Sequence, residues 1–275
     1  KAFLVPEATL AQRLVRAKRK ISEARIPYEI PPPDRLAERL AAVQAVVYLI
    51  FNEGYSAASG DQLVRLDLCA EAIRLGRMLC ALLPEPGNHG LLALMLLHDS
   101  RRLSRVRDGR LVTLEEQDRS LWDRVQISEG LALVEMALRR PPLGAYQVQA
   151  AIAALHAQAA TPQSTDWHQI AALYQKLLEL QPSSVIALNH AVAVAMSAGF
   201  EAGLARIDAL GASGQLDRYY LLYAARADIL RRMNRMPEAR EAYGKALALA
   251  ANRVEQEYLK GRIKETEQWQ PATTT

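Results

Sequence analysis

The amino-acid sequence predicts an all-α protein in which a helical bundle continues into a short right-handed α-solenoid. Several segments carry apolar residues at the spacing of an α-helix, and 50% of the 275 residues are hydrophobic, which is enough for a sizeable core. In addition, two segments share one pattern, in which a tyrosine lies four residues after one packing residue and three residues before another. The two triplets are Ile170, Tyr174 and Leu177, and Ala239, Tyr243 and Ala246.

The two tyrosines, Tyr174 and Tyr243, lie 69 positions apart, close to twice the period of about 34 residues in tetratricopeptide repeats. The pattern resembles the second helix of that repeat, in which small residues let neighbouring helices approach and the ring fills the gap between them. The intervening unit, 184–210, fits less well, because its second helix is short, contains Gly203 and lacks the aromatic residue. The alternative is an ordinary helical bundle with accidental spacing.

Positive charge is concentrated at the N-terminus. Residues 1–26 hold seven basic and two acidic side chains, a balance of +5, whereas the whole chain carries +4. We therefore expect a nucleic-acid footprint only there, because phosphate binding requires a positive excess.

No apolar run reaches the ~18 residues of a membrane-spanning helix, and we expect a cytoplasmic protein. Its two cysteines, Cys69 and Cys80, lie too far apart on one predicted helix to form a disulfide.

Residues 4–21 predict a helix with two faces. An early polar position followed by arginine and lysine is what a recognition helix in the DNA major groove requires, because the first side chains reach base edges and the later ones hold phosphates. The polar ridge contains Thr9, Gln12, Arg13, Arg16 and Lys20, and the apolar stripe contains Leu10, Leu14, Ala17 and Ile21.

The segment from Val5 to Ile21, VPEATLAQRLVRAKRKI, resembles the recognition helix of region four in bacterial extracytoplasmic-function sigma factors. Two positions depart from the family pattern: its usual glycine before the threonine is Ala8, and its usual basic residue is absent at Ala11. Because the first helix of the helix-turn-helix is absent and the chain begins at Lys1, we expect a fragment of a longer protein. The resemblance implies DNA binding by Thr9, Gln12, Arg13, Arg16, Lys18 and Lys20, of which Thr9, Gln12, Arg13 and Arg16 would read the upstream promoter element.

Five regions are expected along the chain. Residues 1–21 are the remnant of a helix-turn-helix, 22–34 a proline-rich linker that favours extended backbone, 35–142 a helical extension domain, 143–269 the repeats with a capping helix, and 270–275 a disordered tail.

Within the extension domain, helices are expected at 36–54, 62–83 and 89–103, and Gly54 is expected to cap the first of them. Asp108 and Gly109 predict the turn of a very short hairpin. Thr113 and Glu116 have the spacing of a capping box, which predicts a helix start at 117–122.

The extension domain also contains polar residues between long apolar helices. We interpret them as a buried polar network that fixes helix packing, in which Glu53 pairs with Arg101 or Arg102. Its members are Asn52, Glu53, His98, Arg101, Arg102, Asp118 and Trp122. The alternative is a catalytic or metal cluster of Glu53, His98, Asp99, Asp118 and Arg119, but no metal-binding, phosphate-binding or nucleophile motif accompanies it. We therefore expect no enzyme activity, cofactor or metal.

The C-terminal half predicts three helical hairpins, followed by a charged helix at 253–268 that is expected to cap the array and face solvent. The hairpins pair 146–158 with 166–180, 184–197 with 201–210, and 217–233 with 237–250. The first helices of such units line a groove, so we expect Asn189 and Arg226 either to bind a peptide or carboxylate or to be ordinary surface residues.

Further segments resemble the C-terminal extension of a subgroup of extracytoplasmic-function sigma factors that ends in tetratricopeptide-like repeats. They include FNEGY at 51–55, LLHDSRR at 96–102, EQDRSLW at 116–122, NHAVAV at 189–194 and RYYLLYAAR at 218–226. The resemblance implies a bacterial protein whose partners are core RNA polymerase, promoter DNA, and a regulatory protein or peptide in the repeat groove. The alternatives are a stand-alone adaptor built from repeats, and an enzyme with a polar pocket between helices.

Overall fold

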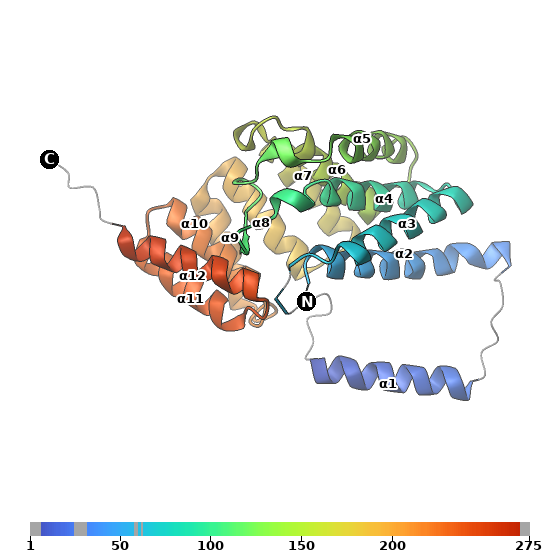
Figure 1. Cartoon of the computed structure of the whole chain (residues 1–275), viewed down its shortest axis with the longest axis horizontal. Helices are drawn as coiled ribbons and strands as arrows, with labels where there is room; N and C mark the ends of the chain where they lie inside the picture. The colour runs from blue at the N-terminus through green and yellow to red at the C-terminus, as the bar shows by residue number, and fades with distance from the viewer. Residues whose placement is uncertain (1–6, 25–31, 58–59, 62, 270–275) are drawn as a thin grey trace. The chain divides into compact units, whose positions relative to one another are not determined.

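The computed structural model describes residues 7–24, 32–57, 60–61 and 63–269, which fall into two compact units, Lys1–Val46 and Val47–Thr275. Apart from one short two-stranded hairpin, the regular elements of the described residues are all helices, as predicted (Figure 1). The elements are α1 (Glu7–Glu23), α2 (Pro33–Tyr55), α3 (Leu66–Leu82), α4 (Pro86–Asp99), η1 (Arg102–Ser104), β1 (Val106–Arg107), β2 (Arg110–Leu111), η2 (Arg119–Leu121), α5 (Arg124–Leu138), α6 (Ala145–Gln158), η3 (Pro162–Ser164), α7 (Trp167–Leu180), α8 (Ser184–Ala198), α9 (Phe200–Ala212), α10 (Tyr220–Arg232), α11 (Met236–Leu249) and α12 (Arg253–Gln268).

The first unit contains α1 and the N-terminal part of α2. The predicted helix at 4–21 is confirmed from Glu7 and continues to Glu23, while its first residues, 1–6, lie outside the described part. Arg19 and Glu23 form an exposed ion pair one helical turn apart at 3.5 Å, which adds a few tenths of a kcal/mol (about 0.3–0.5) to a helix. Most of the predicted linker, residues 25–31, also lies outside the description.

Helix α4 is the centre of the first half of the second unit. Residues Leu91 to Leu97 are buried without exception, and the helix packs against α3, α5 and α6. A helix that is apolar on all sides must be surrounded to be stable in water. Gly130 of α5 allows one of these approaches, because a Cβ atom there would lie 2.8 Å from the Cγ atom of Leu97.

Gly54 does not cap α2, contrary to the expectation from sequence. The helix continues to Tyr55, and Gly54 has no positive φ angle. Its role is close packing: a Cβ atom at Gly54 would lie 2.7 Å from the backbone nitrogen of Cys69 on α3. Cys69 and Cys80 both lie on α3 as free cysteines.

The three predicted hairpins are formed by α6 and α7, α8 and α9, and α10 and α11, and each helix packs against the next (Figure 1). Tyr243 fills the core of the last hairpin and is 1% exposed, whereas Tyr174 is only half-buried. Gly203, which made the middle unit look irregular, lets α8 and α9 approach closely. A Cβ atom there would lie 2.2 Å from the Cβ atom of Ala195.

The predicted hairpin around residues 108 and 109 is confirmed. Strands β1 and β2 pair antiparallel, and Asp108 and Gly109 have φ angles of 51° and 71°. Two positive φ angles match the two-residue turn that aspartate and glycine favour, because its twist fits that of the strands.

The helix start predicted at 117–122 is wrong. Thr113 and Glu116 do form a hydrogen bond of 2.9 Å between their side chains, but a turn and the short helix η2 follow. The physical reason is a second cap further along the chain. Asp123 accepts hydrogen bonds from the backbone N–H groups of Val125 and Gln126, so the α-helix begins at Arg124 instead.

The two ends of the second unit contact each other. Asn252, just before α12, bridges Gly60, and the backbone N–H of Arg253 donates to the carbonyl of Gly60 at 3.1 Å. Strand β2 packs against α12. The ion pairs Glu115–Arg232 and Glu116–Arg262 join the loop after the hairpin to α10 and α12.

Helix α12 follows α11 as the last helix of the array, and one of its sides contacts the first half of the unit instead of solvent. Val254, Glu255, Leu259 and Thr266 are buried. The charged residues of this helix are divided between its exposed side and the contact with the first half of the unit, because Arg262 is only 12% exposed and pairs with Glu116.

Candidate functional site

The predicted DNA-binding residues form an exposed surface on α1. Thr9 is half-exposed, and Gln12, Arg13, Arg16, Lys18 and Lys20 are exposed. At 100° per residue, Thr9, Gln12, Arg13, Arg16 and Lys20 share one side of the helix, while Lys18 lies on the opposite side from Thr9. The ridge therefore presents three cations on one face.

The apolar stripe of α1 is exposed as well. Leu14 and Ile21 are 54% and 58% exposed.

A second candidate site is the polar network around Tyr55, where α2, α4 and the hairpin meet. The Arg101 guanidinium donates to the Tyr55 hydroxyl at 2.9 Å and lies 2.7 Å from Nδ1 of His98. Because arginine has only donors, this His98 nitrogen must accept, which makes His98 neutral with its proton on Nε2. Burial, followed by the charges of Arg101 and Arg105, lowers the pKa of His98 well below its usual range.

Arg105 completes this network from the base of the hairpin. It is 7% exposed, its guanidinium lies 3.5 Å from the centre of the Tyr55 ring, and it donates to the Tyr55 carbonyl. Burial lowers its pKa. The arginine thus satisfies a carbonyl at the C-terminal end of α2, where a cation is also favoured by the helix dipole.

Trp122 lies at the edge of the same network. Its indole N–H donates to the Ser104 hydroxyl at 3.0 Å, and the guanidinium groups of Arg101 and Arg119 lie 5.9 and 4.4 Å from its ring centre. Arg119 also donates to the carbonyls of His156 and Ala159. These contacts close the C-terminal end of α6 rather than form an open pocket.

The remaining predicted members of the network are Arg102, Asp118, Asn52 and Glu53. Arg102 pairs with Asp99 at 2.7 Å and with Asp123 at 3.9 Å. Asp118 is exposed and caps η2 by accepting from Ser120. Asn52 and Glu53 are half-buried on α2. Burial raises the pKa of Tyr48, and a hydrogen bond with the Asn52 side chain offsets part of this rise.

Sequence reasoning missed Tyr55 and Arg105 as central members of this network, and it placed Arg119 only in the alternative cluster. No local pattern distinguishes buried Arg105 from Arg107, which is exposed two residues later. In the part of the chain that the structure describes, no three histidine, cysteine, aspartate or glutamate side chains are placed to hold a metal ion. No helix among the described residues has the length and apolar character needed to cross a membrane.

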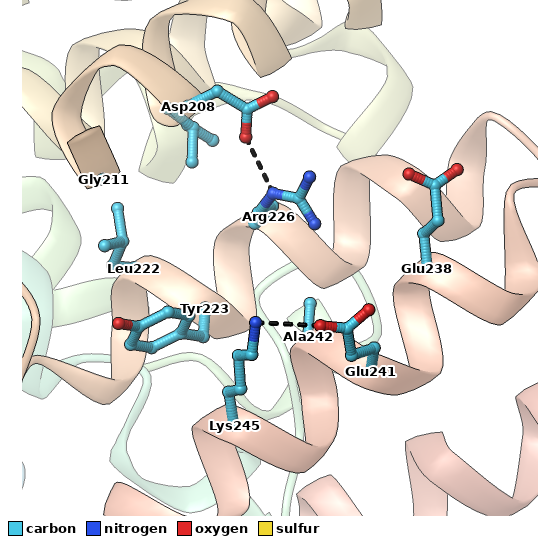
Figure 2. Close-up of a pocket in the computed structure, with 10 residues that line it drawn as sticks. Asp208, Gly211, Leu222, Tyr223, Arg226, Glu238, Glu241, Ala242 and Lys245 are labelled. Atoms are coloured by element: carbon cyan, nitrogen blue, oxygen red, sulfur yellow. Dashed lines mark hydrogen bonds and ion pairs between the residues drawn. The ribbon is translucent and has the colours of Figure 1, made fainter.

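Arg226 lies in a small pocket between α9, α10 and α11, with a volume of about 290 Å³ (Figure 2). Its Nε atom donates to Asp208 at 2.7 Å, and Lys245 pairs with Glu241 at 2.8 Å. Glu238 also lines the pocket, so two cations face three carboxylates. Asn189 is exposed on α8 and is not part of this pocket.

Two comparisons with known proteins bear on these sites. Residues 39–138 match the model of a family of unknown function, DUF6596. The chain is 49% identical over 265 residues to an uncharacterized protein of Rhizobium meliloti (strain 1021), in an alignment that covers 96% of this chain. The chain spans 62% of the length of that relative.

The family match covers the network around Tyr55 and leaves out the other two sites. Tyr55, His98, Arg101, Arg105 and Trp122 all lie within 39–138, whereas α1 and the pocket at Arg226 lie outside it. Neither the description of the family nor the name of the relative states an activity. The function must therefore be argued from the residues themselves.

Proposed function

We propose that this chain is the C-terminal part of a bacterial extracytoplasmic-function sigma factor, which acts in the cytoplasm. In this proposal α1 contacts promoter DNA, and the helical extension regulates initiation through core RNA polymerase or a regulatory protein. The observation that carries the proposal is the exposed basic ridge of α1, in a segment that resembles the recognition-helix pattern except at Ala8 and Ala11. The mechanism involves no covalent chemistry and needs no cofactor.

The ridge suits the two tasks of a recognition helix. Thr9 and Gln12 carry hydrogen-bonding groups that can reach base edges, whereas Arg13, Arg16 and Lys20 bring positive charge to phosphates on the same side. Lys18 faces away from this ridge by helical geometry, so its contribution is limited to the general positive field. The exposed apolar stripe of α1 fits a recognition helix that packs against a companion helix elsewhere in the full-length protein.

The pocket at Arg226 is the proposed contact for a regulatory protein or peptide. Its volume of about 290 Å³ lies near the lower limit of small-molecule pockets, roughly 300 Å³, which suits one or two side chains of a partner. Because its own carboxylates already surround Arg226 and Lys245, the partner would bring an amide or a mixed charge pattern rather than a carboxylate alone.

The test is run-off transcription with core RNA polymerase and the full-length parent protein. The double substitution Arg13→Ala and Arg16→Ala is expected to abolish promoter-specific initiation, while Arg74→Ala, an exposed arginine on α3, leaves it unchanged. Truncation of the parent before Asp34 is expected to alter initiation, because the extension is proposed to regulate it. If the parent supports no initiation on any promoter offered, including the one upstream of its own gene, the sigma-factor proposal is wrong.

DNA binding by this chain alone provides a second measurement. Weak binding is expected, and it should decrease steeply with salt because phosphate contacts release counterions. If Arg16 holds a phosphate, replacing it should reduce the slope of the logarithm of the binding constant against the logarithm of the salt concentration by about one. The loss of affinity should then be similar on all DNA sequences. Tight and sequence-selective binding by the isolated chain would contradict this expectation.

A stand-alone adaptor is the second candidate, favoured by the stacked hairpins and by the contacts between α12 and the first half of the unit. In that case α1 would be incidental, and the parent protein would have no region that binds polymerase. An enzyme built on Glu53 and His98 is the third candidate. Alanine substitution of both residues would then abolish turnover at unchanged thermal stability, whereas a loss of stability alone indicates the structural network.

A further inference from the structure

The tip of the β1–β2 hairpin carries two arginines that face each other. The strand register places Arg107 directly opposite Arg110, so both side chains project from the same face of the hairpin. Both residues are exposed. Like charges directly opposite each other in an antiparallel pair destabilise it, so this arrangement opposes the stability of the hairpin on its own.

Among the described residues these two arginines form no ion pair or hydrogen bond, although the charges of Arg107 and Arg110 help to lower the pKa values of Asp118 and Glu257. Both acidic groups have other partners as well. Asp118 accepts from Ser120 at 2.6 Å, and Glu257 pairs with Lys260 at 2.7 Å. The two guanidinium groups thus keep most of their donors for a partner outside the chain.

A surface hollow lies beside the arginine pair. It is lined by Arg107, Asp108, Arg110, Leu111, Val112 and Glu116. Glu116 is already bound to Arg262 and Thr113, and Leu111 and Val112 are half-buried. The hollow therefore combines two available guanidinium groups and the exposed carboxylate of Asp108 with a partly apolar floor.

The base of the hairpin is fixed, which makes the tip a rigid platform. Below the tip, the backbone N–H of Val112 donates to the carbonyl of Arg105 at 2.9 Å, and the buried Arg105 side chain is bound to Tyr55. Strand β2 packs against α12. A site that is already held in its binding geometry loses less entropy when a partner binds.

We propose that the hairpin tip is a docking site for an acidic segment of a partner protein, whose carboxylates bind Arg107 and Arg110. Guanidinium groups bind carboxylates through two parallel hydrogen bonds, and the apolar floor accepts a neighbouring aliphatic side chain. A protein partner fits better than nucleic acid, because residues 27–275 carry a net charge near −1 and nucleic acid requires an extended basic surface. This site is separate from α1 and does not depend on the proposed role in transcription.

The probe for the test is a fluorescein-labelled peptide, acetyl-Glu-Glu-Leu-Glu-Glu-Leu-amide, titrated with the whole chain and followed by fluorescence anisotropy at low salt. The double substitution Arg107→Gln and Arg110→Gln is expected to weaken binding at least about tenfold, because it removes both charge-assisted contacts. The lysine pair Arg107→Lys and Arg110→Lys keeps the charge but loses the fork of donors, so an intermediate loss is expected.

Two matched controls separate this site from other positive charge. Arg218→Gln with Arg240→Gln changes two exposed arginines elsewhere and is expected to leave peptide binding unchanged. Arg13→Gln with Arg16→Gln removes charge from the ridge of α1 and is also expected to leave it unchanged. All these side chains are exposed, so the variants should fold, which circular dichroism checks.

Three results would overturn the proposal. The first is unchanged peptide binding by the Arg107 and Arg110 glutamine variant. The second is a loss that the α1 variant or the control pair reproduces, because the peptide would then report general positive charge. The third is stronger binding of a short DNA duplex than of the peptide that depends on the same two arginines, which would assign the tip to nucleic acid.

Discussion

Helices α1 and α4 have similar lengths, 17 and 14 residues, and opposite surroundings. Every residue from Leu91 to Leu97 of α4 is buried, whereas Leu14 and Ile21 of α1 are 54% and 58% exposed. Helix α4 is stabilised by packing on all sides. Within helix α1, Arg19 and Glu23 form a local pair, and intrinsic propensity with such pairs holds a helix of this length only marginally.

The comparison shows what an apolar pattern in a sequence can establish. The stripe on α1 and the continuous apolar run on α4 both predicted helices, and both helices form. The run on α4 also requires burial, because a helix without a polar face cannot be left in water. An apolar stripe on one side of a helix shows which side another helix would cover. It does not show whether that other helix is present.

The largest expected effect on stability comes from truncating a leucine of α4, and the same change on α1 tests the difference between the two helices. Leu96→Ala removes a fully buried side chain from α4 and is expected to lower the free energy of unfolding by about 2–5 kcal/mol, since it leaves a cavity in a close-packed core. The matched change Leu14→Ala on α1 is expected to stay within about 0.5 kcal/mol. Urea unfolding of both variants measures the difference. Equal losses would mean that Leu14 is covered in solution.

Two glycines of the repeats also differ in their surroundings: Gly203 is closely packed and Gly244 is open. Gly203→Val is expected to destabilise the chain by about 1–3 kcal/mol, because a side chain at Gly203 would overlap Ala195 and the backbone of α8. Gly244→Ala, in the middle of α11 and without neighbours within 4 Å of the added carbon, is expected to stabilise the chain by up to about 1 kcal/mol. Thermal unfolding measures both. A tolerated valine at Gly203 would show that α8 and α9 can separate.

Most of the helices could be predicted from the sequence, because their signals are local. The helix 253–268 was predicted to the residue, and the hairpin at 108 and 109 followed from turn chemistry. The contacts of α12 could not be predicted in this way. Glu115 meets Arg232 across 117 positions and Glu116 meets Arg262 across 146, and no local pattern records a pairing at that distance. A helix rich in charge was therefore expected to face solvent.

The candidate sites also contain features that local sequence predicts and features that only the fold determines. Exposure of Gln12, Arg13 and Arg16 followed from helical spacing, since a helix with a polar ridge turns it to water. The network around Tyr55 was predicted only in part. His98, Arg101 and Trp122 were expected to lie together, but the roles of Arg105 and Arg119 depend on where the hairpin and the end of α6 are placed by the fold.

Half-buried and exposed histidines should differ in their effect on the pH dependence of stability. Burial lowers the pKa of His156 from 6.5 to about 4 and lowers that of His98 well below its usual range. The unfolded chain binds protons at both residues below about pH 6.5 while the folded chain does not, so stability is fully present above that pH and falls as the pH decreases. We expect a loss of about 1 kcal/mol for each histidine at about pH 5.5.

Urea unfolding at neutral pH and at about pH 5.5 measures this loss. His156→Gln is expected to reduce the difference between the two conditions, because glutamine does not titrate. His168→Gln is the control, since His168 is exposed on α7. If the stability of the parent chain is the same at both pH values, His98 and His156 are accessible to protons in the folded state.

The smallest expected effect concerns the ion pairs that join the hairpin loop to the C-terminal helices. Glu115→Gln and Glu116→Gln remove the carboxylates that bind Arg232 and Arg262. Each substitution should cost more than Glu71→Gln, which breaks an exposed pair with Arg74 on α3, because Arg262 is only 12% exposed and its charge is less screened. We expect about 1 kcal/mol or less for each, and hydrogen exchange in α12 should rise in the Glu116 variant while exchange in α4 stays the same. A uniform rise in both helices would mean that the ends of the unit separate only when the whole unit unfolds.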